Sequence, residues 1–276
     1  MNIKVETLDP KIIPFQGERR SFIWEVFNSG SVKDGFIGIP ELGYVVDIVN
    51  GLYSAVYPYR NPDLAEKQVR KVLNNPREIL MLAKHNGEYV GYGAFPRLRV
   101  DEDSFMYSSR AFLAEFDGDG LGTNALDQAI DMHNEELARA HRHYLVYGAL
   151  YTQNPASIAS VIRSERTNNI HPFRNFGGFY EMNSTPQRVM QETHARFLAN
   201  SRVLYNLTGV CKGELWGLGA NQSYIPGRSA LADEIHREMV GPDDLDMNIP
   251  QGDVVIVVYD IKKPEIAERA LVNLAA

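Results

Sequence analysis

The stretch Asp117-Gly118-Asp119-Gly120-Leu121-Gly122-Thr123 places a glycine-rich loop near the middle of the chain. Its alternating glycines leave backbone amides uncovered and permit positive φ, so the chain can fold closely around an anion. An apolar segment, 111–114, precedes the loop, and a helical pattern of apolar residues runs from Leu126 to Leu137 after it. A strand, a glycine loop and a helix N-terminus in this order form a phosphate site, because unpaired amides and the helix dipole both point at the ligand.

Two common phosphate-binding loops do not fit this spacing. A Walker loop requires Gly-Lys-Ser/Thr after its last glycine, whereas Gly122 is followed by Thr123 and Asn124. The dinucleotide fingerprint is Gly-x-Gly-x-x-Gly, whereas Gly118, Gly120 and Gly122 alternate. The loop therefore belongs to neither class.

The loop resembles the acyl-CoA loop of the GNAT superfamily of N-acyltransferases, Arg/Gln-x-x-Gly-x-Gly/Ala. Asp117, Gly120 and Gly122 stand at its three defined positions. This family usually continues with a strand, an Asn-led helix and a Gly-Phe pair. The corresponding segments here are 145–152, Asn154-Pro155-Ala156 and Gly178-Phe179. The resemblance covers about residues 79–180, somewhat over a third of the chain.

The resemblance implies a cosubstrate and the residues that bind it. The cosubstrate is acetyl-CoA or another acyl-CoA, and the backbone amide of about Leu113 would bind the thioester carbonyl. The remaining cofactor-binding residues that it implies are Asp117, Gly118, Asp119, Gly120, Leu121, Gly122, Thr123 and Asn154. An amine would attack directly in a ternary complex, after losing its proton to a carboxylate or to water.

Two positions depart from the pattern of the family. The basic or amide residue of the loop is Asp117, which removes a phosphate partner and adds a negative charge. The tyrosine that often serves as general acid, seven residues after the leading Asn, is Val161. Tyr107 and Tyr151 are the substitutes, on the two strands expected to splay around the thioester. The third catalytic candidate, Arg110, lies inside an apolar strand and must find an anion, either a structural Asp or Glu or a substrate carboxylate.

We therefore expect an acyl-CoA-dependent N-acyltransferase that transfers an acetyl group to a primary amine of a small molecule or peptide. Two alternatives stay open. One is a catalytically degenerate CoA-binding or regulatory module that keeps the GNAT fold, which the residues at 117 and 161 favour. The other is an enzyme of the same fold that uses a different acyl acceptor.

Composition narrows the partners of this chain of 276 residues. Its 44% hydrophobic and 23% charged side chains are ordinary for a soluble globular protein. The single cysteine, Cys211, excludes an internal disulfide framework and fits a reducing, cytoplasmic compartment. No run approaches the ~20 apolar residues of a membrane span, and the N-terminus lacks a secretory signal. A net charge of −7 gives no support for a nucleic-acid partner. A homodimer is compatible with the sequence.

Other motifs exclude further classes of function. The histidines, aspartates and glutamates show no spacing typical of a metal site, so we expect no bound metal. No Gly-x-Ser-x-Gly elbow occurs, which disfavours a hydrolase of that type.

Three antiparallel strands are expected before the loop. Asn86-Gly87 is a strong hairpin signal between strands over 79–83 and 89–95, and a further strand covers 105–113. The two glycines in the second of these strands indicate that something packs close to the backbone there.

The remaining segments are interpreted from periodicity and capping. Residues 44–49 form either a strand or a short buried helix, and the polar residues 165–176 form a loop. A continuous apolar strand, 143–152, is buried on both faces in the way of a helix-covered parallel strand. Helices are expected over 18–28, from Asn61-Pro62, from Asn154-Pro155 and over 186–200.

These elements predict an α/β fold with a mixed sheet of the GNAT type, with antiparallel early strands and one parallel pair. We expect a single GNAT-like domain over residues 1–276. Its core covers about 60–181, an insertion or extension covers about 182–252, and the last strand of the sheet covers about 254–261.

Overall fold

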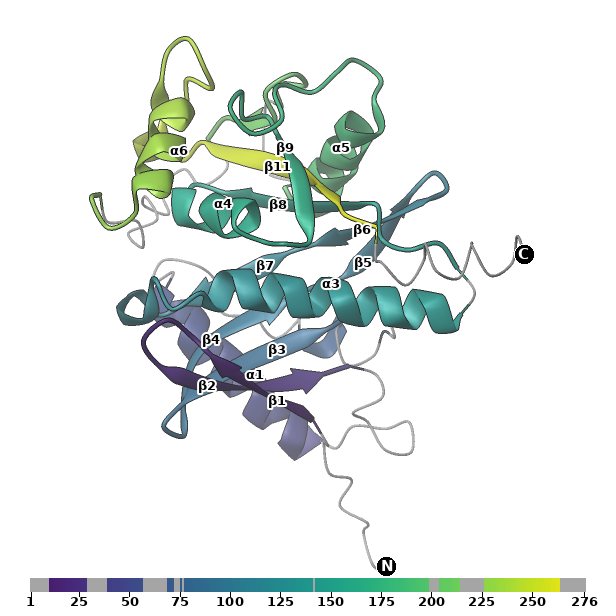
Figure 1. Ribbon diagram of the computed structural model, residues 1–276, viewed down its shortest axis with the longest axis vertical. Coiled ribbons are helices and arrows are strands. Elements are labelled where there is room, and N and C mark those ends of the chain that lie inside the picture. The colour runs from purple at the N-terminus through teal and green to yellow at the C-terminus, as the bar shows by residue number, and fades with distance from the viewer. Residues whose placement is uncertain are drawn as a thin grey trace, which may run out of the picture. The chain divides into compact units, whose positions relative to one another are not determined.

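The computed structural model describes residues 10–28, 39–56, 69–71, 75, 77–140, 142–198, 204–213 and 226–263 (Figure 1). The described residues fall into two compact units. The first contains those up to Pro96 together with 108–125, and the second contains 97–107 and those from Leu126 onward. Each unit has a sheet of its own. The single domain over 1–276 stays a prediction.

The first unit contains an antiparallel sheet with the strand order β1-β2-β3-β4-β7. The strands are β1 Lys11–Gln16, β2 Ser21–Phe27, β3 Leu80–His85, β4 Glu88–Ala94 and β7 Ser109–Phe112. The predicted hairpin is confirmed, because Asn86 and Gly87 join β3 to β4 with φ of 50° and 87°. Two positive φ values at adjacent turn residues are typical of the tightest hairpins.

One face of this sheet is covered by α1, Ile39–Val56. The open choice for residues 44–49 is therefore settled as a helix. Val45, Val49 and Leu52 of α1 belong to the same core cluster as Leu82 and Tyr92 of the sheet. The helix expected from Asn61-Pro62 begins outside the described residues.

The helix predicted over 18–28 is wrong, because these residues contain strand β2. Phe22, Trp24 and Val26 are buried, while Ile23 between them is exposed, which is the alternation of a strand with one covered face. Apolar residues four apart, such as Phe22 and Val26, satisfy a helical and a strand spacing equally. Pairing with β1 and β3 decides the outcome here.

The second unit contains the strand order β10-β11-β8-β6-β5, and β9 also pairs with β11. The strands are β5 Arg97–Val100, β6 Asp103–Tyr107, β8 Tyr147–Thr152, β9 Thr167–His171, β10 Val210–Cys211 and β11 Val254–Ile261. Strands β6 and β8 are parallel and the other described pairs are antiparallel. The strand predicted over 254–261 is β11. The strand predicted over 143–152 is confirmed only at Tyr147–Thr152, where Tyr147 and Tyr151 are half-buried, and 143–146 lie outside it.

The polar loop predicted over 165–176 is partly wrong, because Thr167–His171 is strand β9. Asn168 and Asn169 are exposed and only Thr167 and Ile170 are buried, so no apolar alternation marks the strand in the sequence. Backbone pairing with β11 defines this segment as a strand, which its side-chain pattern does not indicate.

The strand predicted over 105–113 divides at Ser108. β6 pairs with β8, whereas β7 pairs with β4, so the two halves of one extended segment belong to different sheets. The described helices after it are η3 Ala114–Phe116, α3 Leu121–Arg139, α4 Pro155–Ile162, α5 Thr185–Phe197, α6 Ala230–Val240 and η4 Ile249–Gln251. None of the helices in the described ranges is long and apolar enough to cross a bilayer.

The predicted mixed α/β fold, with antiparallel early strands and one parallel pair, is therefore present. The helix expected after the glycine loop is α3, and the apolar stripe from Leu126 to Leu137 is buried along it. The helices expected from Asn154-Pro155 and over 186–200 correspond to α4 and α5. The extent of an insertion over 182–252 stays a prediction.

Close packing over β4 gives a test of the first sheet. A Cβ at Gly91 would lie 2.1 Å from Cδ1 of Phe112 and 2.9 Å from the carbonyl oxygen of Ala111. We expect Gly91→Ala to lower the free energy of unfolding by roughly 1–3 kcal/mol through overpacking. Urea denaturation measures this change.

The matched control is Gly51→Ala on α1 of the same unit, where a Cβ would meet nothing within 4 Å. Alanine in a helix interior is favoured over glycine by roughly 0.5–1 kcal/mol, so this variant should be unchanged or more stable. Equal stabilities for the two variants would contradict the β4–β7 packing.

Candidate functional site

The glycine loop has a backbone that only glycine adopts without strain. Gly118 and Gly120 have φ of 85° and 77°, in the left-handed region. The carbonyl of Gly120 accepts from the amide of Asn124 at 2.9 Å, so α3 begins directly after it. The amides of Leu121 and Gly122 lie in the first turn, where N–H groups have no acceptor within the helix. Gly120 has no side chain to cap them, so the loop can present these amides to an anion.

Asp119 anchors the loop to the turn between β1 and β2. Its carboxylate is fully buried and accepts from the backbone N–H of Arg19 at 3.0 Å and from Nη1 of Arg20 at 2.9 Å. Arg20 also donates to the carbonyl of Glu115 at 2.8 Å and lies 4.8 Å above the ring of Phe116. The same turn approaches so closely that a Cβ at Gly17 would lie 2.6 Å from the carbonyl oxygen of Asp119. In this structure Asp119 therefore binds two arginines.

Asp117, at the basic position of the family loop, is exposed. Its backbone carbonyl accepts from the guanidinium of Arg19. Nη2 of Arg19 lies 3.3 Å from the position that a Cβ at Gly118 would occupy. A positive charge thus lies beside the loop, although the loop sequence contains none.

Two further contacts fix the first turn of α3. Nη1 of Arg110 on β7 donates to the carbonyl of Gly122 at 2.5 Å, and Nε1 of Trp24 on β2 donates to Oδ1 of Asn124 at 2.8 Å. The contact of Arg110 is to a carbonyl, and the anion that the sequence predicts for this arginine stays a prediction. Both side chains connect the sheet of the first unit to the start of α3.

The amide of Leu113 is already engaged in sheet pairing. It donates to the carbonyl of Val90 at 3.0 Å, so it is not available to a thioester carbonyl without breaking this bond. Hydrogen bonds alternate along an antiparallel strand, and the amide of Phe112 therefore points away from β4. Because β7 is the last strand in the order of its sheet, the amide of Phe112 faces an edge. The direction of each amide depends on the partner strand, which the sequence does not show, and the cofactor-binding role of Leu113 stays a prediction.

The second unit contains the predicted tyrosines. Tyr107 ends β6 and is buried, with its ring stacked on Phe197 of α5 at a centroid distance of 3.9 Å. Tyr151 on the paired strand β8 is half-buried, and its ring stacks on that of Tyr107 at 6.0 Å. Strands β6 and β8, which the sequence analysis expects to splay apart around the thioester, pair with each other at Phe105–Tyr107.

A third tyrosine, Tyr147, also lies on β8. Its burial, and then the carboxylates of Asp260 and Asp103, raise the pKa of its phenol, which keeps the phenol protonated.

Asn154 acts as a helix cap. Its side-chain oxygen accepts from the amide of Ala156 at 2.9 Å, and its own amide donates to Oγ1 of Thr152 at 2.8 Å. Val161, at the family's tyrosine position, is fully buried in α4 and has no proton to donate. The cofactor-binding role of Asn154 stays a prediction.

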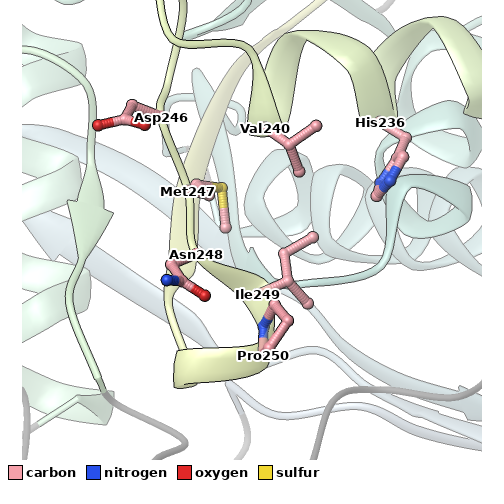
Figure 2. A pocket seen from close by; sticks show the side chains of 7 residues that line it. All are labelled: His236, Val240, Asp246, Met247, Asn248, Ile249 and Pro250. Atoms are coloured by element: carbon pink, nitrogen blue, oxygen red, sulfur yellow. The ribbon is translucent and has the colours of Figure 1, made fainter.

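A pocket of about 500 Å³ opens in the second unit at the end of α6 (Figure 2). His236 and Val240 of α6 line one side, and Met247 and Ile249 of the following segment line the other. None of the residues predicted from the sequence lines it. In the described part of the chain no group of three or more His, Cys, Asp or Glu side chains could hold a metal ion.

Comparison with known proteins finds remote similarity to solved structures. No family model matches the chain, and no curated protein matches it. Mycobacterium smegmatis RimJ in complex with CoA-disulfide is similar with 12% identity, over 61% of this chain and 81% of that one, at a TM-score of 0.39. The GNAT domain of S. lividans PAT is 10% identical, over 63% of this chain and 92% of that one, with a TM-score of 0.39.

RimL, a ribosomal L7/L12 alpha-N-protein acetyltransferase, in complex with coenzyme A, is 14% identical over 63% of this chain and 89% of that one, with a TM-score of 0.38. Of these three structures, the PAT structure is described as a GNAT domain and the RimL structure as an acetyltransferase. With identities of 10–14% and TM-scores below 0.5, these likenesses carry no argument about the family or activity of this chain.

The anchoring role of Asp119 can be tested by removing its charge. Because the carboxylate is fully buried between two arginine contacts, we expect Asp119→Asn to lower the free energy of unfolding by about 2 kcal/mol or more. The exposed Asp117→Asn is the control, with an expected change within about 0.5 kcal/mol. Urea denaturation compares them, and an Asp119→Asn variant as stable as the wild type would contradict the anchor.

Proposed function

We propose that this chain binds acyl-CoA at the glycine loop and transfers the acyl group to a primary amine of a small molecule or peptide. The observation that carries the proposal is the loop itself. Two left-handed glycines open α3 and leave its first amides without helical acceptors. Arginines of the first unit lie beside them. This combination fits a diphosphate, because amide dipoles and guanidinium groups both favour negative charge.

The backbone around the loop supports this proposal. A Cβ at Gly120 would have Phe15 Cζ at 3.8 Å as its nearest contact, so the protein itself leaves room above this glycine. The absence of a side chain there lets a phosphate approach the amides of Leu121 and Gly122. The outward amide of Phe112 is a donor for an acyl carbonyl at the edge of β7.

Bound acyl-CoA would supply a thioester, whose carbon–sulfur bond breaks as the new bond to the amine nitrogen forms. The residues of this chain would hold the cosubstrate, polarise its carbonyl and move protons. The amine loses a proton to water or to a carboxylate before attack, and a protein acid protonates the departing sulfur. Tyr107 and Tyr151 stay the proposed sources of that proton, and the half-buried Tyr151 is the more accessible of the two.

A second candidate function is a CoA-binding module without transfer. Its specific support is Val161, a fully buried residue without an ionisable group at the family's tyrosine position. Binding and turnover separate the two. A thermal-shift assay with acetyl-CoA tests binding, and release of free thiol with a panel of amines tests transfer. Binding without thiol release would favour the module.

The loop assignment predicts a loss of binding in Gly120→Val. A branched side chain there would occupy the space proposed for the phosphate, so the affinity for acetyl-CoA measured by calorimetry should fall below detection. Valine at positive φ also strains the backbone, and Gly87→Val controls for this strain in the same unit. Gly87 has φ of 87° and no heavy atom within 4 Å of its Cβ position, so this control should bind normally. Unchanged affinity in folded Gly120→Val would overturn the loop assignment.

The proposed acid predicts a separate kinetic effect. If Tyr151 protonates the departing thiolate, Tyr151→Phe should lower kcat by roughly 10²-fold or more and leave the affinity for acetyl-CoA unchanged. Tyr107→Phe is the matched variant, because it removes the hydroxyl of the ring that stacks on Tyr151. Equal kcat for Tyr151→Phe and the wild type would remove Tyr151 from this role.

A further inference from the structure

We propose that Arg19, in the turn between β1 and β2, is the cation that binds the diphosphate of acyl-CoA, an inference that rests on the function proposed above. Residues 113–124, which form the loop and its flanks, contain no lysine, arginine or histidine. They add exposed carboxylates at Glu115 and Asp117 instead. Amides alone would have to hold a multiply charged anion beside these carboxylates. A cation from another part of the chain would offset this repulsion and strengthen binding.

Three arginines of the first unit contact the loop, and their side chains differ in exposure. Arg20 pairs with the buried Asp119, which it shares with Arg19, and its guanidinium also binds the carbonyl of Glu115; its side chain is 33% exposed. Arg110 is half-buried on β7 and binds the carbonyl of Gly122 at the start of α3. The side chain of Arg19 is 57% exposed. Of the three, Arg19 therefore offers the most accessible guanidinium to a ligand.

The position of Arg19 is set by the loop that it would serve. Its backbone N–H is bound to the carboxylate of Asp119 at 3.0 Å, and its Nε lies 3.5 Å from the same oxygen. Its Nη2 donates to the carbonyl of Asp117 and lies 3.3 Å from the Cβ position of Gly118. The guanidinium is thus held over the left-handed glycine at which the loop turns.

Guanidinium chemistry suits this place. An arginine carries five N–H donors in a planar fork, which matches two phosphate oxygens at once. The contacts to Asp117 and Asp119 use only part of this capacity. The charge of Arg19 also offsets that of the exposed Asp117, which would otherwise repel the ligand. Arg19 would thereby take the role of the basic residue that is missing at position 117, although the two positions are far apart in the sequence.

Calorimetry with two ligands tests this inference. CoA contains the diphosphate, and acetyl-pantetheine lacks it. We expect Arg19→Gln to weaken CoA binding by about tenfold, the effect of losing one partly exposed charge-assisted contact, and to leave acetyl-pantetheine binding unchanged. Arg77→Gln, at an exposed arginine of the same unit, is the matched control and should bind both ligands as the wild type does. The double variant Arg19→Gln/Asp117→Arg should regain most of the CoA affinity.

The outcomes separate the two proposals. If the wild type binds CoA and Arg19→Gln binds it equally well, the role of Arg19 is wrong and the proposed function stands. If Arg19→Gln weakens both ligands equally, Arg19 only holds the fold, and its assignment to the diphosphate is overturned. If the wild type binds no CoA, the proposed function fails, and this inference fails with it. Melting temperatures of all variants show that each measurement is made on folded protein.

Discussion

The candidate site depends on the buried carboxylate of Asp119. An ionised carboxylate removed from water is costly unless donors surround it, and here both come from one turn, the backbone of Arg19 and the side chain of Arg20. Loop and turn are 100 residues apart in the sequence, and this contact joins them in the fold. The anchor also places Arg19 beside the glycines. The contacts of Asp119 thus join the loop to the β1–β2 turn and also hold the positive charge of Arg19 at the candidate site.

The proposed chemistry uses backbone amides that the loop, α3 and β7 position. The left-handed glycines end the turn and start α3, which leaves the first amides of the helix available. The hydrogen bonds of Arg110 and Trp24 hold that first turn against the sheet. The pairing of β7 with β4 directs the amide of Phe112 toward the sheet edge. The proposed acyl transfer by direct attack would need mostly positioning and oriented dipoles, and the backbone amides named above would supply such dipoles.

Local patterns in the sequence predicted the parts of the fold that local forces determine. The glycine loop, the hairpin at Asn86-Gly87 and the strand over 254–261 each carry their signal in consecutive residues. Strand β2 was predicted as a helix because its apolar residues fit both periods until the neighbouring strands are known. The partners of Asp119 could not be predicted, since no spacing connects residues 100 positions apart. The hydrogen bond from the amide of Leu113 to Val90 could not be predicted either, because the register of a strand depends on its partner strand.

The amide resonances of the loop test the central claim most directly. In protein labelled with ¹⁵N-glycine, CoA should shift the signals of Gly118, Gly120 and Gly122, because their amides would lie in or beside the diphosphate site. Acetyl-pantetheine, which lacks the diphosphate, should shift them far less. Glycines outside the loop, such as Gly51 and Gly227, serve as internal references. Saturable CoA binding that leaves all three loop signals unmoved would contradict the account.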